Sequence, residues 1–116
     1  MMELEKDVER WLGQEVRKLG GLWFKFTSPG RTGVPDRILI LQGQVIFVEM
    51  KTAKGTLSAI QKATIRQIVK DGGVPVHVVY GRAGAEKFLA DLRNPWGLTT
   101  DEALKPDLWE WKGGDA

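Results

Sequence analysis

The segment from Asp36 to Lys51 constrains the fold more than any other part of the chain. It reads DRILIL, then Gln42-Gly43, then QVIFVEMK. Two near-continuous apolar runs separated by two turn-forming residues are typical of a β-hairpin whose strands are covered on both faces. The sequence therefore predicts two antiparallel strands inside a layered domain, with charged side chains only at the open end of the hairpin.

The segments around this hairpin predict an α/β architecture. Apolar residues recur at three- and four-residue steps before Gly20-Gly21 and again before Gly72-Gly73, a pattern typical of amphipathic helices that end at glycine. Segments rich in β-branched and aromatic residues predict two further strands. The expected elements are helix 4–19, strand 22–27, loop 28–35, strands 36–41 and 44–51, helix 57–71, strand 74–80 and helix 83–92.

The order of these elements, α-β-β-β-α-β-α, predicts one α/β domain that spans residues 1–116. A chain of 116 residues is long enough for one hydrophobic core. We expect this core to lie within about residues 3–93. Residues 94–116 form a tail that contains three tryptophans and shows no clear period.

Composition excludes several kinds of site. The chain has no cysteine and a single histidine, His77. Disulfides and thiolate metal sites are therefore excluded, a zinc site is disfavoured, and His77 is expected to be a packed strand residue. No apolar run approaches the roughly 18 residues that span a bilayer. We therefore expect a cytoplasmic protein that does not contact membranes.

The charged residues are unevenly distributed along the chain. Residues 101–116 hold five acidic and two basic side chains, whereas the first hundred residues hold 15 basic and 10 acidic ones. A basic body attracts polyanions. A solvated surface of mixed charge fits the same distribution, so charge alone does not decide for nucleic-acid binding.

The open end of the hairpin brings two acids together. If Gln42 and Gly43 are the central residues of the turn, Asp36 faces Glu49 with Cβ atoms about 5 Å apart. Two such carboxylates repel each other unless a cation lies between them, and Mg²⁺ or Mn²⁺ prefers oxygen ligands of this kind. Lys51 lies on the same strand face as Glu49. These residues would form a compact site for a phosphodiester.

Two alternatives remain open for these three residues. A three-residue turn would shift the pairing by one residue and place Asp36 opposite Met50, with the two acids as diagonal neighbours. The three charges could also be strand-end residues in water, with Lys51 in a surface ion pair.

The spacing of these residues also resembles a known family. Pro35-Asp36 is followed thirteen residues later by EMK, which resembles the PD…(D/E)xK signature of the PD-(D/E)XK nuclease superfamily. Together with SPGRTGVPDR and LSAIQ, it is similar to the VRR-NUC (virus-type replication-repair nuclease) family, in particular to small stand-alone members from bacteriophages. The resemblance runs from about Glu3 to Tyr80. It implies a restriction-endonuclease-like core with a mixed sheet flanked by helices.

The resemblance also implies roles for individual residues. Asp36, Glu49 and the backbone carbonyl of Met50 would bind Mg²⁺ or Mn²⁺. Lys51 would orient or polarise the attacking water and help to stabilise charge on the phosphate. Gln61 would support the lysine and the water. Two candidates in the first helix, Glu5 and its competitor Glu9, lie one turn apart on the same face, and Glu5 matches better the acid that completes the metal shell through water.

Each of these roles has a structural alternative. Gln61 stands three residues after Ser58, so it also fits a capping box at a helix N-terminus. Either glutamate of the first helix could simply lie on a solvated helix face. The loop and the residue after Asp36 provide candidate DNA contacts in Ser28, Arg31 and Arg37, because arginine fits phosphate geometry. An outward strand position is the alternative for Arg37.

These residues lead us to expect a metal-dependent, structure-selective DNA endonuclease that needs no nucleotide cofactor. The resemblance implies four-way (Holliday) junctions or branched DNA as substrate and a homodimer as the active form. The three tryptophans of the tail lead us to expect the segment from Trp96 to Trp111 at or over the dimer contact, and the alternative is a monomer whose tail packs on its own core. Two alternatives stay open. One is a non-catalytic DNA-binding or assembly module with the nuclease fold, and the other is a restriction-like or RecB-like nuclease acting on linear DNA.

Overall fold

The computed structural model describes residues 4–93, so the expectations for the tail at 94–116 lie outside the described residues. Within this range the elements follow the order expected from the sequence. They are α1 (Glu5–Lys18), β1 (Leu22–Lys25), β2 (Arg37–Leu41), β3 (Gln44–Lys51), α2 (Ala59–Lys70), β4 (Val76–Tyr80) and α3 (Gly81–Arg93). None of the helices between residues 4 and 93 is long and apolar enough to cross a membrane.

The four strands form one mixed sheet in the order β1-β2-β3-β4. β1 pairs with β2 and β2 with β3 in antiparallel fashion, whereas β3 and β4 are parallel. A two-residue turn joins β2 and β3, whereas the parallel strands β3 and β4 need a crossover, which α2 provides. The expectation of a mixed sheet flanked by helices is confirmed.

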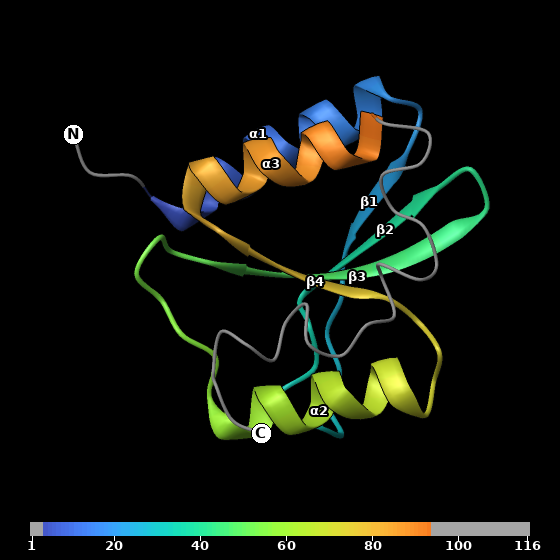
Figure 1. Cartoon of the computed structure of the whole chain (residues 1–116), viewed down its shortest axis with the longest axis vertical. Coiled ribbons are helices and arrows are strands. Elements are labelled where there is room, and N and C mark those ends of the chain that lie inside the picture. The colour runs from blue at the N-terminus through green and yellow to red at the C-terminus, as the bar shows by residue number, and fades with distance from the viewer. Residues whose placement is uncertain (1–3, 94–116) are drawn as a thin grey trace.

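Helices cover both faces of the sheet (Figure 1). α1 and α3 lie side by side over one face, where Leu12, Val16 and Phe88 belong to the same buried cluster as Leu39 and Val48. α2 lies over the other face, and its apolar side chains form a second, smaller cluster with Phe47 of β3 and with Val76 and Val78 of β4. The apolar runs of the hairpin are therefore explained by burial on both sides.

Element ends differ slightly from those expected from the sequence. The first strand ends at Lys25, although the Phe26 N–H still donates to the Asp36 carbonyl over 2.9 Å. α3 begins at Gly81, directly after the last strand. Gly81 has φ of 64°, a conformation that glycine adopts without steric cost. This residue turns the chain from strand into helix with no intervening loop.

Candidate active site

The hairpin turn fixes the register that brings the two acids together. Gln42 and Gly43 have φ of 51° and 81°, which is typical of a two-residue type I′ turn. Leu41 consequently pairs with Gln44, and Arg37 with Val48. One step further along this register, Asp36 faces Glu49. The structure thus has the two-residue turn and not the three-residue alternative.

Both carboxyl groups are shielded from water, although Asp36 is only half-buried. Glu49 is only 6% exposed, and burial together with the negative charge of Asp36 raises its pKa to about 7. Burial also raises the pKa of Asp36 above its usual range, although the charge of Arg37 partly offsets this effect. Asp36 Oδ1 is buried and has no hydrogen-bond partner among the residues described. The positive charges of Arg37 and Lys51 therefore offset only part of the effect of burial and mutual repulsion on this pair.

Two further side chains converge on one oxygen of Glu49. Lys51 Nζ lies 4.0 Å from Glu49 Oε2, and Gln61 Nε2 donates to the same oxygen over 3.1 Å. The Lys51 side chain is only 20% exposed, so it is not a strand-end charge in open water. β3 provides Glu49 and Lys51, and α2 provides Gln61.

Gln61 also caps the helix that carries it. Its Oε1 accepts from the Ser58 N–H over 2.9 Å, while its own N–H donates to Ser58 Oγ over 3.2 Å. This is a complete capping box. The expected capping box is therefore present, and the nitrogen of the same amide contacts Glu49.

The two acids of α1 have different environments. Glu9 Oε2 accepts from Trp23 Nε1 over 2.7 Å and from Arg37 Nε over 2.8 Å, and these bonds, chiefly the one from Arg37, hold its pKa below the usual range. Glu5 is exposed, and its charge contributes to the raised pKa of Glu49. Within residues 4–93, no three acidic or histidine side chains lie close enough to form a metal cluster. Glu5 therefore does not form a three-acid cluster with Asp36 and Glu49.

The environment of Arg37 is a correction to the sequence interpretation. We expected either a DNA contact or an outward strand residue, but its side chain is 15% exposed and pairs with Glu9. Its Nη1 also donates to the Asp36 carbonyl over 2.8 Å. Arg37 therefore fixes the backbone of Asp36 from the α1 side of the sheet.

Sequence reasoning missed the residue that permits this network. A Cβ on Gly13 would lie 2.6 Å from Cδ1 of Trp23, a separation that real side chains do not adopt. The absence of a side chain lets Trp23 approach α1 and reach Glu9. An isolated glycine inside a helical pattern is the signal that could have indicated it.

The other expected DNA contacts lie toward α2. Arg31 Nη2 donates to Thr64 Oγ1 over 3.3 Å, and the Arg31 N–H donates to the Ser28 carbonyl over 3.2 Å. Gly33 has φ of 86°, and a Cβ there would come within 2.8 Å of the Ile60 carbonyl oxygen. The loop is therefore packed against α2, and Ser28 and Arg31 line a cavity of about 480 Å³ beside that helix.

Comparison with known proteins identifies the family. A family model described as the VRR-NUC domain matches residues 3–83. The chain belongs to the VRR-NUC family. A solved structure titled VRR_NUC domain superposes on this VRR-NUC chain with a TM-score of 0.64 and 26% identity, covering 74% of this chain and 94% of the other. The resemblance inferred from the hairpin and loop is thereby confirmed.

Two further proteins resemble this VRR-NUC chain. "Putative nuclease p44" of Acyrthosiphon pisum secondary endosymbiont phage 1 is 56% identical over 48 residues, which are 40% of this chain and 52% of the phage protein. The chain thus matches about half the length of this curated relative. The Holliday junction resolvase Hjc of Archaeoglobus fulgidus shares the fold, with a TM-score of 0.51, 21% identity, and coverage of 65% of this chain and 66% of the resolvase.

The residues at the site of this VRR-NUC chain fit a hard divalent cation. Two adjacent carboxylates, one buried and one half-buried, have raised pKa values and repel each other, and an oxygen-preferring cation between them would relieve that repulsion. The unpartnered Asp36 Oδ1 provides a ligand atom with no competing hydrogen bond among the described residues. The donor set is made of oxygen alone, which suits Mg²⁺ or Mn²⁺ better than zinc.

Proposed function

We propose that this VRR-NUC protein is a metal-dependent DNA endonuclease. The observation that carries the proposal is the pairing of half-buried Asp36 with buried Glu49, with Lys51 and Gln61 both directed at Glu49 Oε2. Two like charges side by side and shielded from water lower the stability of the fold, and a cation bound between them would offset this cost. The family membership and the nuclease name of the phage relative support the same conclusion.

In the proposed site, Asp36, Glu49 and the Met50 carbonyl would hold Mg²⁺ or Mn²⁺, which would supply positive charge for water activation and for the phosphate. Lys51, close to Glu49 and partly exposed, stabilises negative charge that develops on the phosphate. Gln61 fixes the orientation of Glu49 from α2. We assign Glu5, rather than Glu9, to an outer role through water, because Glu9 is already bound to Trp23 and Arg37.

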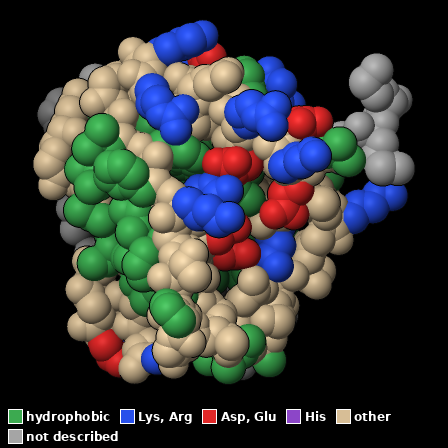
Figure 2. Space-filling model, turned by 180° about the vertical axis from the view of Figure 1, so that it is seen from behind, with side chains coloured by type: hydrophobic (Ala, Val, Ile, Leu, Met, Phe, Trp, Pro, Cys, Tyr) green, Lys and Arg blue, Asp and Glu red, His purple; other side chains and the backbone are tan. Residues whose placement is uncertain are grey.

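DNA would approach a face on which charges of both signs are mixed. Figure 2 shows acidic side chains lying among Lys and Arg side chains on one part of the surface. Basic residues around an acidic metal site attract the polyanion, while the metal offsets the acids. We assign Ser28 and Arg31 to backbone contacts and Arg37 to positioning Asp36.

We further propose four-way or branched DNA as the substrate and a homodimer as the active form. A symmetric dimer presents two active sites, one for each strand to be cut, and two-fold dimers are the commonest oligomers. Leu22, Phe24 and Val45 are 50%, 50% and 42% exposed on one face of the hairpin end of the sheet, where Figure 2 shows hydrophobic side chains gathered. Such a patch favours a protein contact. The Trp96-to-Trp111 segment lies outside the described residues.

The test is incubation with linear, forked and four-way DNA in Mg²⁺, Mn²⁺ or EDTA, with sedimentation at micromolar concentration. We expect metal-dependent paired cuts in the four-way substrate by a dimer. Binding without cleavage in every metal would favour the non-catalytic module. Equal cleavage of linear DNA by a monomer would favour the restriction-like or RecB-like nuclease. We place the protein in the cytoplasm of a bacterial or phage-infected cell, where such DNA occurs.

A further inference from the structure

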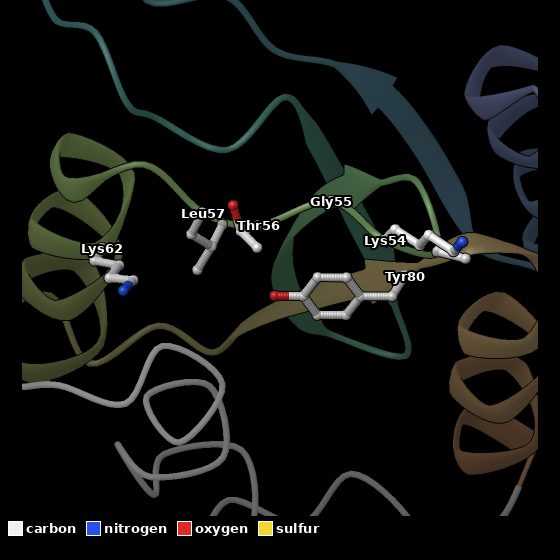
Figure 3. A pocket seen from close by; sticks show the side chains of 7 residues that line it. Lys54, Gly55, Thr56, Leu57, Lys62 and Tyr80 are labelled. Carbon is white, nitrogen blue, oxygen red and sulfur yellow. The ribbon is translucent and has the colours of Figure 1, made fainter.

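A second hollow lies next to the proposed active site. It has a volume of about 470 Å³ and is formed by the loop after β3, the first turns of α2 and the end of β4. The side chains that matter for its chemistry are Lys54, Thr56, Lys62 and Tyr80 (Figure 3). We call this hollow the Tyr80 pocket. Figure 3 shows the Tyr80 ring between Lys54 and Lys62, which come from opposite ends of the pocket.

The Tyr80 pocket adjoins the active site where β4 pairs with β3 and where the loop after β3 begins. Tyr80 is the register partner of Lys51 in the parallel β3–β4 pair, so both side chains stand on the same face of the sheet. Lys62 follows Gln61 on α2. The loop from Thr52 to Gly55 is a tight turn, closed by a hydrogen bond of 3.0 Å from the Gly55 N–H to the Thr52 carbonyl.

This loop is also packed closely against Lys51. A Cβ on Gly55 would lie 3.1 Å from Thr52 Oγ1 and 3.4 Å from the Cβ of Lys51. A phosphodiester chain leaving the active site past Lys51 would therefore meet Lys54 and Tyr80 next.

The lining of the pocket suits a nucleotide. It has two ammonium groups, two hydroxyls and an aromatic ring, and none of the residues from 4 to 93 that line it is acidic. Ammonium groups bind phosphates as point charges, and aromatic rings pack on bases or sugars of any sequence. The cavity near Arg31 differs, because it is lined by Asp71 and by Phe26, Phe47 and Ile68. A polyanion is therefore better accommodated in the Tyr80 pocket.

We propose that the Tyr80 pocket binds the nucleotide next to the scissile phosphate, with its sugar or base on Tyr80 and its flanking phosphates on Lys54 and Lys62. This proposal rests on the proposed function, since it names how the DNA strand is held beside the site. It makes the pocket a sequence-tolerant contact that would align the scissile phosphate with Asp36, Glu49 and Lys51.

The test measures DNA binding separately from cleavage. Fluorescence anisotropy in EDTA gives the Kd of a labelled four-way junction and a labelled single strand, at several salt concentrations. The variants are K54Q, K62Q, the double variant, Tyr80→Leu and Tyr80→Phe. The control is K87Q, because the Lys87 side chain is 81% exposed on α3 and pairs with Asp91. Thermal melting verifies that each variant is folded.

We expect each lysine variant to weaken binding at least about threefold and to reduce the salt slope by roughly 0.7–0.9. Tyr80→Leu should weaken binding roughly tenfold, and Tyr80→Phe should bind like the wild type because the ring is retained. In cleavage assays with metal, the lysine variants and Tyr80→Leu should raise KM more than they lower kcat, and Tyr80→Phe should match the wild type. K87Q should be unchanged in every assay.

The outcomes separate this inference from the proposed function. If the wild type binds DNA in EDTA and the pocket variants bind less well, but nothing is cut in Mg²⁺ or Mn²⁺, the nuclease assignment is wrong and the pocket assignment stands. If the wild type cuts DNA and the pocket variants match K87Q in Kd, salt slope and KM, the pocket assignment is wrong. Failure of the wild type to bind any DNA would reject both.

Discussion

Gln61 Nε2 lies 3.1 Å from Glu49 Oε2, so the amide that caps α2 also fixes a carboxylate at the centre of the proposed site. The contact joins the crossover helix to β3. Helix capping and the orientation of Glu49 therefore depend on the same side chain, and the two functions can be separated by mutation.

Gln61→Ala and Ser58→Ala should separate capping from catalysis. Each breaks the capping box and should cost about 1 kcal/mol of unfolding free energy. Only Gln61→Ala also removes the contact with Glu49, so it alone should lower kcat substantially. Urea denaturation and single-turnover cleavage measure the two effects. An equal loss of kcat in Ser58→Ala would mean that Gln61 acts only through the helix.

Asp36→Asn and Glu49→Gln should abolish cleavage without unfolding the protein. Each removes one charge from a buried like-charge pair, so the metal-free protein should be as stable as the wild type or more stable. Cleavage assays and thermal melting in EDTA measure these effects. Near wild-type cleavage by either variant would remove that residue from the site.

The raised pKa of Glu49 predicts how the stability of the metal-free protein depends on pH. A carboxyl with a folded-state pKa of about 7 and an ordinary unfolded value binds more protons when folded, so stability should fall as pH rises from about 4.5 to 7. The full effect is at most roughly 3 kcal/mol.

His77 gives an opposite slope, so the Glu49 effect must be measured as a difference. Burial lowers the pKa of His77 to about 4, and stability from this residue is lost as pH falls below its unfolded value of about 6.5. The melting temperature of Glu49→Gln minus that of the wild type should therefore increase between pH 5 and pH 8 in EDTA. A difference that does not change with pH would contradict the shifted pKa.

Lys51→Ala and Arg31→Ala should affect opposite steps. Lys51 lies beside Glu49, so its removal should lower kcat by roughly 10²-fold or more and change DNA affinity little. Arg31 lies at the loop near Thr64, so its removal should weaken binding and reduce the salt slope by about 1. Single-turnover rates and anisotropy at several salt concentrations test both. Preserved kcat in Lys51→Ala would make Lys51 a phosphate-binding residue only.

Glu9→Gln and Glu5→Gln should distinguish a structural acid from a site acid. Glu9 accepts hydrogen bonds from both Trp23 and Arg37. Glu9→Gln leaves the largely buried Arg37 guanidinium without its negative partner, so it should lower the unfolding free energy by about 1–3 kcal/mol. Glu5 is exposed, so Glu5→Gln should change the unfolding free energy little. It should instead raise the metal concentration that cleavage requires. Melting curves and metal titrations distinguish them. A stable Glu9→Gln variant with weakened metal binding would reverse the assignment.

Much of the arrangement follows from local sequence. Gln42-Gly43 can form a type I′ turn, and the apolar runs on either side continue as strands, so Asp36, Glu49 and Lys51 are placed by residues close to them in the chain. The order of elements, the buried hairpin and the capping box of Ser58 and Gln61 were predictable for the same reason. The resemblance to VRR-NUC sequences added the identity of the fold.

The rest was decided by contacts between distant segments. Glu5 and Glu9 share one helix face, so the sequence alone could not tell which of them is bound by other side chains. It is Glu9, because Gly13 lets Trp23 approach α1 and because Arg37 reaches Glu9 from β2. The position of Arg31 against Thr64, and of Tyr80 beside Lys51, likewise depends on how α2 and β4 pack on the hairpin. Turns and periodic patterns are encoded by neighbouring residues, whereas these pairings arise only when the sheet brings separate elements together.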